Sequence, residues 1–159
     1  MIEIRSANHA DVERVSRIWH MGWHEVHDGN VPDALVDART RESFARRSAD
    51  RVSDTVVAVV DGAVAGFVMV NDDEVDQVYV ADNDRGTGIA AAVLTAGERR
   101  IAEQGYAAAW LAVVPSNARA RRFYERQGWQ DGGLFEHTAP GPTGPIAVVC
   151  HRYIRYLRQ

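Results

Sequence analysis

Residues 85–90, Arg-Gly-Thr-Gly-Ile-Ala, separate a predicted strand from a predicted helix. Glycines let the backbone approach a ligand closely, and the exposed amides of a first helical turn carry about half a positive charge. The segment therefore predicts a phosphate-binding turn, with a pyrophosphate as its natural ligand. Residues 86–91 also match the G-x-G-x-x-A variant of the dinucleotide fingerprint, which requires an acidic residue about 20 positions later. The next strand ends Ala-Val-Val-Pro at 112–115, so that acid is absent.

Three histidines, His20, His24 and His27, fall on one stripe of a helix predicted over residues 12–27. Histidines at this spacing can ligate a metal, but the sequence contains no H-E-x-x-H pattern and no separate motif for a third ligand. We therefore expect no metal. The single cysteine, Cys150, excludes an internal disulfide framework, and we expect it to pack inside the last strand and not to act as a nucleophile.

The pattern of apolar residues predicts about seven strands and four helices. The strands are expected at residues 2–5, 55–60, 64–70, 74–80, 107–114, 129–137 and 146–156. The helices are expected at residues 12–27, 32–47, 89–104 and 117–127. The strand–helix–strand order over 74–114 predicts two parallel strands joined by a right-handed crossover. The Pro/Gly-rich residues 138–145 predict an irregular, mobile loop.

Strand 74–80 contains both charged and apolar residues. Simple alternation predicts two faces, one with Val75 and Tyr79 and the other with Glu74, Asp76, Val78 and Val80.

A length of 159 residues, with 46% hydrophobic and 25% charged residues, is typical of one soluble domain, here residues 1–159. The formal net charge of -4 gives no electrostatic footprint for nucleic acid. No apolar run approaches the roughly 20 residues of a membrane span, and the N-terminus lacks a basic leader. We therefore expect a cytoplasmic protein with neither nucleic acid nor membrane as a partner.

A second motif, residues 111–129, reads Leu-Ala-Val-Val-Pro-Ser-Asn-Ala-Arg-Ala-Arg-Arg-Phe-Tyr-Glu-Arg-Gln-Gly-Trp. Together with residues 85–90 and the strand before them, it resembles the GCN5-related N-acetyltransferase (GNAT) family, whose phosphate motif is Q/R-x-x-G-x-G/A. The likeness runs from the first strand to about Trp129. It implies an α/β fold, an α+β mixed sheet of the GNAT-like acyl-CoA N-acyltransferase type. In that fold the central parallel strands, 74–80 and 107–114, splay apart around acetyl-CoA.

The resemblance also implies how acetyl-CoA is held. Backbone amides of the turn would bind the pyrophosphate, the strand before it would pair with the pantetheine, and the amide of Val78 would polarise the thioester carbonyl. Asn117 would contact the cofactor arm, although helix capping alone also explains an asparagine there. The cofactor-binding residues implied are Val78, Tyr79, Val80, Arg85, Gly86, Thr87, Gly88, Ile89, Ala90, Ala91, Asn117 and Tyr124.

Acyl transfer to an amine needs a proton acceptor, because an alkyl ammonium has a pKa of about 10.4. By resemblance Glu74 is the candidate general base, with Asp76 on the same strand and the imidazoles of His24 and His27 as alternatives. Tyr124 matches the family's general acid, which returns a proton to the leaving thiolate; its alternative role is aromatic packing.

The first two helices form the acceptor wall in proteins similar to this one, so Trp23, His24 and His27 are candidate substrate-binding residues. Core packing is the alternative for Trp23. The acceptor, a small-molecule or peptide amine, cannot be identified from the sequence, and a homodimer is common among similar proteins. Three other functions stay open: transfer of a larger acyl group, a non-catalytic acyl-CoA sensor, and a nicotinamide oxidoreductase.

Overall fold

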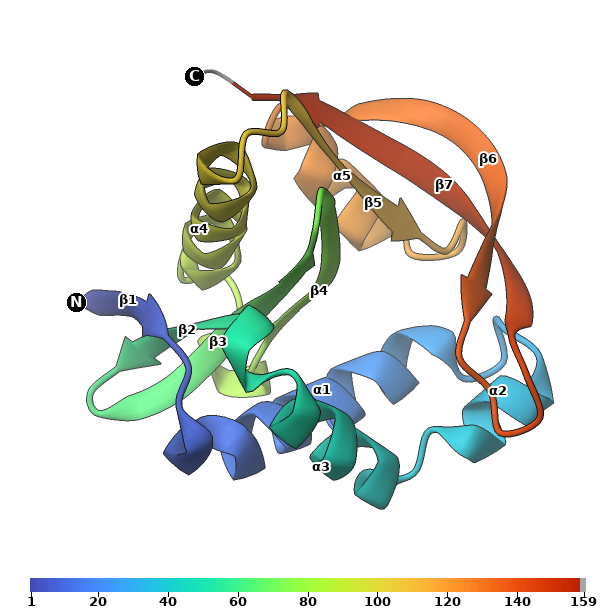
Figure 1. Cartoon of the computed structure of the whole chain (residues 1–159), viewed down its shortest axis with the longest axis horizontal. Coiled ribbons are helices and arrows are strands. Elements are labelled where there is room, and N and C mark those ends of the chain that lie inside the picture. Colours follow the sequence, from blue (N-terminus) through green and yellow to red (C-terminus); the bar gives the residue numbers. More distant parts are fainter. Residues whose placement is uncertain (158–159) are drawn as a thin grey trace.

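The computed structural model describes residues 1–157, which form seven β-strands and five α-helices (Figure 1). The strands are β1 (Ile2–Ser6), β2 (Thr55–Val60), β3 (Ala63–Asn71), β4 (Glu74–Val80), β5 (Ala108–Val113), β6 (Gln130–Ala139) and β7 (Ile146–Tyr156). The helices are α1 (Val12–His27), α2 (Asp33–Ala38), α3 (Arg41–Asp50), α4 (Ile89–Glu103) and α5 (Ala118–Arg126). The predicted mixed α/β fold is confirmed.

All seven strands belong to one sheet, in the order β1-β2-β3-β4-β5-β7-β6. Neighbouring strands are antiparallel except β4 and β5, which are parallel. Within the described residues this parallel pair is joined in register only at Glu74 and Trp110. Beyond that point the two strands diverge, as Figure 1 shows at the centre of the molecule, so the predicted splay is confirmed.

Helices α1, α2 and α3 cover one face of the sheet (Figure 1). Trp19 is fully buried there and makes edge contacts with Phe44 of α3 and Phe67 of β3. Gly22 lets α1 approach the sheet, since a Cβ at this position would lie 2.4 Å from the ring of Tyr79. Trp23 is also buried, at 6% exposed, which confirms the core packing considered for it.

Helices α4 and α5 cover the opposite face, where Ile89, Leu94 and Tyr124 pack over the apolar residues of β2 to β5. The two faces therefore have separate apolar clusters, one under each layer of helices. Within residues 1–157, no helix combines the length and the apolar character that crossing a membrane requires.

Strand β4 contains a β-bulge. The register with β3 passes from Gln77 opposite Met69 to Val75 opposite Val70, so Asp76 is the extra residue. An extra residue shifts the alternation of side chains by one position. Val75, Val78 and Val80 consequently belong to the α4 face, whereas Tyr79 packs in the cluster beneath α1. The faces predicted from simple alternation are wrong for this reason.

The single helix predicted over residues 32–47 is also wrong, because the chain forms two helices there. Arg39 leaves the helical conformation, with φ −90° and ψ 68°. Thr40 then caps α3, its Oγ1 accepting a hydrogen bond from Ser43 N at 3.1 Å. Threonine competes with the helical backbone for hydrogen bonds and is preferred at such caps. The break places Arg39 at a buried junction, 6% exposed.

Strands β6 and β7 form a hairpin that continues further than predicted. Thr138 and Ala139, predicted to lie in an irregular loop, instead pair with Ala147 and Ile146. Residues 140–145 make the turn, and Arg39 Nη2 donates to Pro140 O at 2.8 Å. This hydrogen bond links the turn to the α2–α3 junction.

Candidate active site

A cleft lies where β4 and β5 diverge. It is lined by both strands, by parts of α1, α2, α3 and α5, and by the β6–β7 hairpin. Predicted site residues on its wall are Glu74, Asp76, Val78, Tyr79, Asn117 and Tyr124. The splay therefore gathers predicted carboxylates, the predicted acid and part of the predicted coenzyme wall around one space.

The predicted phosphate-binding turn comes directly before α4. Gly86 and Gly88 have φ +76° and +85°, conformations that favour glycine. A Cβ at either glycine would meet no atom within 4 Å, so the space beside the turn is open. The amides of the first turn of α4, which begins at Ile89, have no acceptor within the helix. Open space beside free donors is what a diphosphate requires.

The side chain of Arg85 points away from this turn to α1. Its two Nη atoms donate to the carboxylate of Glu25 at 2.8 and 2.7 Å, and Asp82 lies 3.3 Å away. Arg119, in the first turn of α5, is 3.7 Å from the same carboxylate. The Arg85 guanidinium lowers the pKa of Glu25 below its ordinary value. Glu25 therefore bridges the starts of α4 and α5.

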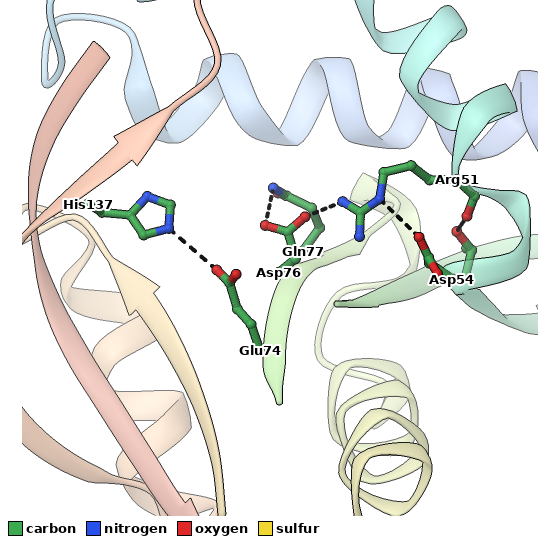
Figure 2. A network of polar contacts seen from close by, with 7 residues as sticks. Arg51, Asp54, Glu74, Asp76, Gln77 and His137 are labelled. Atoms are coloured by element: carbon green, nitrogen blue, oxygen red, sulfur yellow. Dashed lines mark hydrogen bonds and ion pairs between the residues drawn. The ribbon is translucent and has the colours of Figure 1, made fainter. Parts of the chain in front are cut away.

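Glu74 and Asp76 point from β4 toward the α1–α3 layer (Figure 2). His137 of β6 approaches from across the cleft, with Nε2 3.4 Å from Glu74 Oε2. Asp76 forms an ion pair with Arg51, which also lies 3.5 Å from Asp54. The charge of Asp76 is thus compensated by a guanidinium, whereas Glu74 faces an imidazole that can exchange a proton with it.

Tyr124 of α5 is 9% exposed and packs against the rings of Trp129 and Tyr153. Burial raises the pKa of Tyr124, so the phenol is protonated at neutral pH. Asn117 caps α5, its Oδ1 accepting from Ala120 N at 3.2 Å. Tyr124 packs against aromatic rings and also lines the cleft. Asn117 caps α5 and also lines the cleft. For each residue, the structural role therefore leaves a role at the site possible.

Residues 17–129, more than half of the chain, match the sequence profile of the Acetyltransferase (GNAT) family. The chain belongs to the GNAT family. The resemblance seen in the two motifs is thereby confirmed, and the protein is an acetyl-CoA-dependent N-acetyltransferase. The dinucleotide interpretation of residues 86–91 is wrong, since a mainly parallel sheet accompanies that fingerprint and this GNAT sheet has one parallel pair.

The chain is similar to other acetyltransferases in sequence and in structure. It is 31% identical over 106 residues to Uncharacterized N-acetyltransferase Rv2669 of Mycobacterium tuberculosis, covering 63% of this chain and 68% of that protein. Its fold is similar to that of yncA, a putative acetyltransferase from Salmonella typhimurium solved with acetyl-CoA, with TM-score 0.73, 17% identity and 100% and 95% of the two chains covered. It is also similar to the PaiA N-acetyltransferase of Thermoplasma acidophilum in complex with coenzyme A, with TM-score 0.71, 15% identity and 99% of both chains covered.

The cleft wall includes two of the three predicted substrate-binding residues. Trp23 and His27 line the cleft, with their rings stacked 4.3 Å apart. Burial lowers the pKa of His27, so its imidazole is neutral at neutral pH. His24 lies outside the cleft wall, and its ring nitrogens are 2.7 Å from Asp28 Oδ1 and 2.6 Å from Arg39 O. The structure therefore gives His24 a position behind the wall, where it contacts the backbone of Arg39.

Three basic residues on the cleft wall escaped prediction: Arg39, Arg47 and His137. No local motif marks them. Arg39 reaches the cleft because α2 ends there, and His137 does so because β6 pairs with β7 in a register that carries it to Glu74. Thr40 is a favourable helix cap inside the helix predicted over residues 32–47, and it is the signal that could have located the break between α2 and α3.

The remaining candidates concern metals and thiols. Within residues 1–157, no group of three or more His, Cys, Asp and Glu side chains is arranged to hold a metal ion. Cys150 is buried in β7, as expected, and burial raises its pKa to about 11. The thiol is therefore protonated at neutral pH and a poor nucleophile.

Proposed function

We propose that this GNAT enzyme transfers the acetyl group of acetyl-CoA directly to a primary amine while both are bound in the cleft. The observation that carries the proposal is the convergence of the splayed strands, Glu74 and Tyr124 on one space. The thioester supplies an activated acetyl group and a thiol leaving group. The residues of the chain hold the two substrates and move the protons.

The coenzyme is held mainly by backbone groups. Amides of residues 86–91 bind the diphosphate, supported by the positive φ of Gly86 and Gly88 and by the open space beside them. The backbone of residues 78–80 pairs with the pantetheine arm, because the divergence from β5 leaves this edge of β4 without a neighbouring strand there. Arg85 has a supporting role, since its side chain is engaged by Glu25.

Glu74 acts as the proton acceptor for the amine. An alkyl ammonium must lose a proton before its nitrogen can attack, and Glu74 lies on the cleft wall with His137 3.4 Å away to accept the proton in turn. Asp76 is the less available proton acceptor, because its carboxylate is engaged in an ion pair with Arg51.

Tyr124 acts as the general acid. As the new C–N bond forms and the C–S bond breaks, the phenol donates its proton to the leaving sulfur, and solvent returns a proton to the phenolate. Tyr124 lines the cleft and its phenol is protonated at neutral pH, which supports this role. The amide of Val78, on the cleft wall, polarises the thioester carbonyl as charge develops on its oxygen.

The test is release of free thiol from acetyl-CoA in the presence of a panel of primary amines, with acetylated products identified by mass. We expect release that depends on the amine. If the protein binds coenzyme A tightly but none of the amines causes thiol release, it is a sensor and the proposal is overturned. Parallel assays with propionyl- and succinyl-CoA distinguish acetyl transfer from transfer of a larger acyl group.

A further inference from the structure

Two arginines at the helical end of the cleft lack a carboxylate partner. Arg39 is 6% exposed; its Nη2 donates to Pro140 O, and its guanidinium lies 6.0 Å from the ring centroid of Trp23. Arg47 of α3 lies with its guanidinium 4.5 Å from the ring centroid of Trp19. Both side chains line the cleft. Among the ion pairs of residues 1–157, neither arginine is paired with an acidic side chain.

The carboxylates on the cleft wall are already engaged elsewhere. Asp76 is held by Arg51, and Glu74 faces His137 across the cleft. The cleft therefore has a separation of charge, with an acidic and imidazole region on β4 and β6 and a basic region on α2–α3 whose arginines form no ion pair within residues 1–157. Burying a cation without an anion is costly, so proteins normally pair or hydrate such groups.

The electrostatics of Arg47 agree with this description. Burial is the main cause that lowers the pKa of Arg47 to about 10, and the neighbouring charge of Arg39 contributes to that value. Two cations that repel each other in a partly buried wall gain most from an anion placed between them. Guanidinium groups match the planar geometry of a carboxylate better than an ammonium does.

We propose that the acceptor is a small primary amine that carries a carboxylate, as a free amino acid does, and that Arg39 and Arg47 bind this carboxylate. The amino end then faces Glu74 and His137, so the two charged regions of the cleft match the two charges of a zwitterion. This proposal rests on the proposed function, since it names the class of amine that the same cleft accepts.

His24 serves Arg39 as a positioning residue. Its Nε2 contacts Arg39 O at 2.6 Å, just where α2 ends, and its Nδ1 contacts Asp28. These contacts hold the backbone that carries the Arg39 guanidinium.

The experiment compares matched acceptors with acetyl-CoA, scored as thiol release. Each of the twenty common L-amino acids is assayed beside its carboxamide and, where one exists, its decarboxylated amine. We expect the best amino acid to exceed its own amide at least tenfold in kcat/KM. Arg47→Gln should remove that preference by raising KM for the acid, so that kcat/KM falls much more for the acid than for the amide. Arg47→Lys keeps the charge but loses the planar guanidinium, so its preference for the acid over the amide should lie between that of wild type and that of Arg47→Gln.

The matched control is Arg46→Gln, the neighbouring arginine of α3, which is exposed and outside the cleft. It should leave the acid-to-amide ratio unchanged. Melting temperatures, and titration of a good amino acid onto the coenzyme A complex by calorimetry, separate lost binding from lost folding.

Each outcome has a definite meaning. If amides or decarboxylated amines are acetylated as well as the acids, or if only amines outside the panel are acetylated, this inference is overturned and the proposed function stands. If coenzyme A binds but no amine of any kind releases thiol, the proposed function fails and takes the inference with it. Should wild type prefer acids while both Arg47 variants keep that preference, folded and active, the assignment to the two arginines is wrong.

Discussion

At the proposed coenzyme end of the cleft, the groups that face the ligand are main-chain amides in the turn before α4 and in its first helical turn. At the acceptor end they are side chains from α1, α2, α3, β4 and β6. The first arrangement is encoded within six consecutive residues, two of them glycines with positive φ. The second requires elements far apart in the chain, such as Arg39 and Pro140, to meet.

This difference predicts different responses to substitution. Backbone donors are lost only when the conformation changes, whereas side-chain groups can be removed one at a time. Substitutions at five positions, described below with their controls, test that contrast.

The largest effect is expected for Gly88→Val. A β-branched residue at φ +85° is strained, and its side chain enters the open space beside the turn. We expect coenzyme A to bind about 1,000-fold more weakly, from roughly 4 kcal/mol of strain and lost hydrogen bonds. Isothermal calorimetry measures this directly.

Gly62→Val is the matched control for that variant. Gly62 has φ +80° and equally open surroundings, but lies in the β2–β3 turn. It should lose similar stability and retain coenzyme affinity. If Gly88→Val bound coenzyme A as tightly as Gly62→Val does, the diphosphate would have to bind elsewhere.

Tyr124→Phe should lower kcat about 100-fold, the scale typical of a lost general acid, with the dissociation constant of coenzyme A nearly unchanged. Tyr106→Phe, on a tyrosine outside the cleft, is the control for loss of a phenol. Stopped-flow turnover and calorimetry give the two quantities. An unaltered kcat would remove Tyr124 from the proton pathway.

Glu74→Gln should lower kcat/KM about 10-fold at neutral pH, because His137 remains beside the amine to accept the proton. The double variant with His137→Asn should lose more than the product of the two single losses, because each single variant keeps one proton acceptor and the double variant keeps neither. Fully multiplicative losses would show that His137 does not replace Glu74.

Glu25→Gln tests the bridge between Arg85 and Arg119, and its effect should be small. Releasing Arg85 from the carboxylate makes the guanidinium available to a phosphate, so coenzyme affinity should rise about two- to threefold. The gain should shrink in high salt, because the groups involved are partly exposed. Weaker binding would instead indicate that Glu25 positions the turn.

Cys150→Ala should change kcat/KM less than about twofold. With its pKa raised to about 11, the thiol has about 100-fold less thiolate at pH 8 than an ordinary cysteine. Iodoacetamide should therefore label the native protein slowly, with the rate increasing as the pH rises toward 11. Rapid labelling at pH 8 together with loss of activity would contradict this.

The sequence predicted the structure around the glycine turn well because its signals are local. The glycine turn, the strand before it and the order of strand, helix and strand can each be read within a short window. The GNAT fold and the splay followed from those signals and from the resemblance.

The acceptor end was predicted less well because its geometry depends on register. The faces of β4 were misassigned since the bulge at Asp76 appears only when β4 is paired with β3. Arg39 was missed because a continuous helix was predicted where the chain breaks between α2 and α3. His137 was missed because its approach to Glu74 depends on the pairing of β6 with β7 and on the place of that hairpin in the sheet. Side chains that meet across a sheet carry no mark in the linear sequence.

The extra residue in β4 divides one strand into two independent parts. Glu74, before the bulge, and Asp76, the bulged residue, point toward the α1–α3 layer (Figure 2), whereas Val78 and Val80, after it, belong to the α4 face. In the proposed site, the start of the strand faces the acceptor and its end faces the coenzyme. One extra amino acid would therefore let a single strand serve two ligands with separate sets of residues.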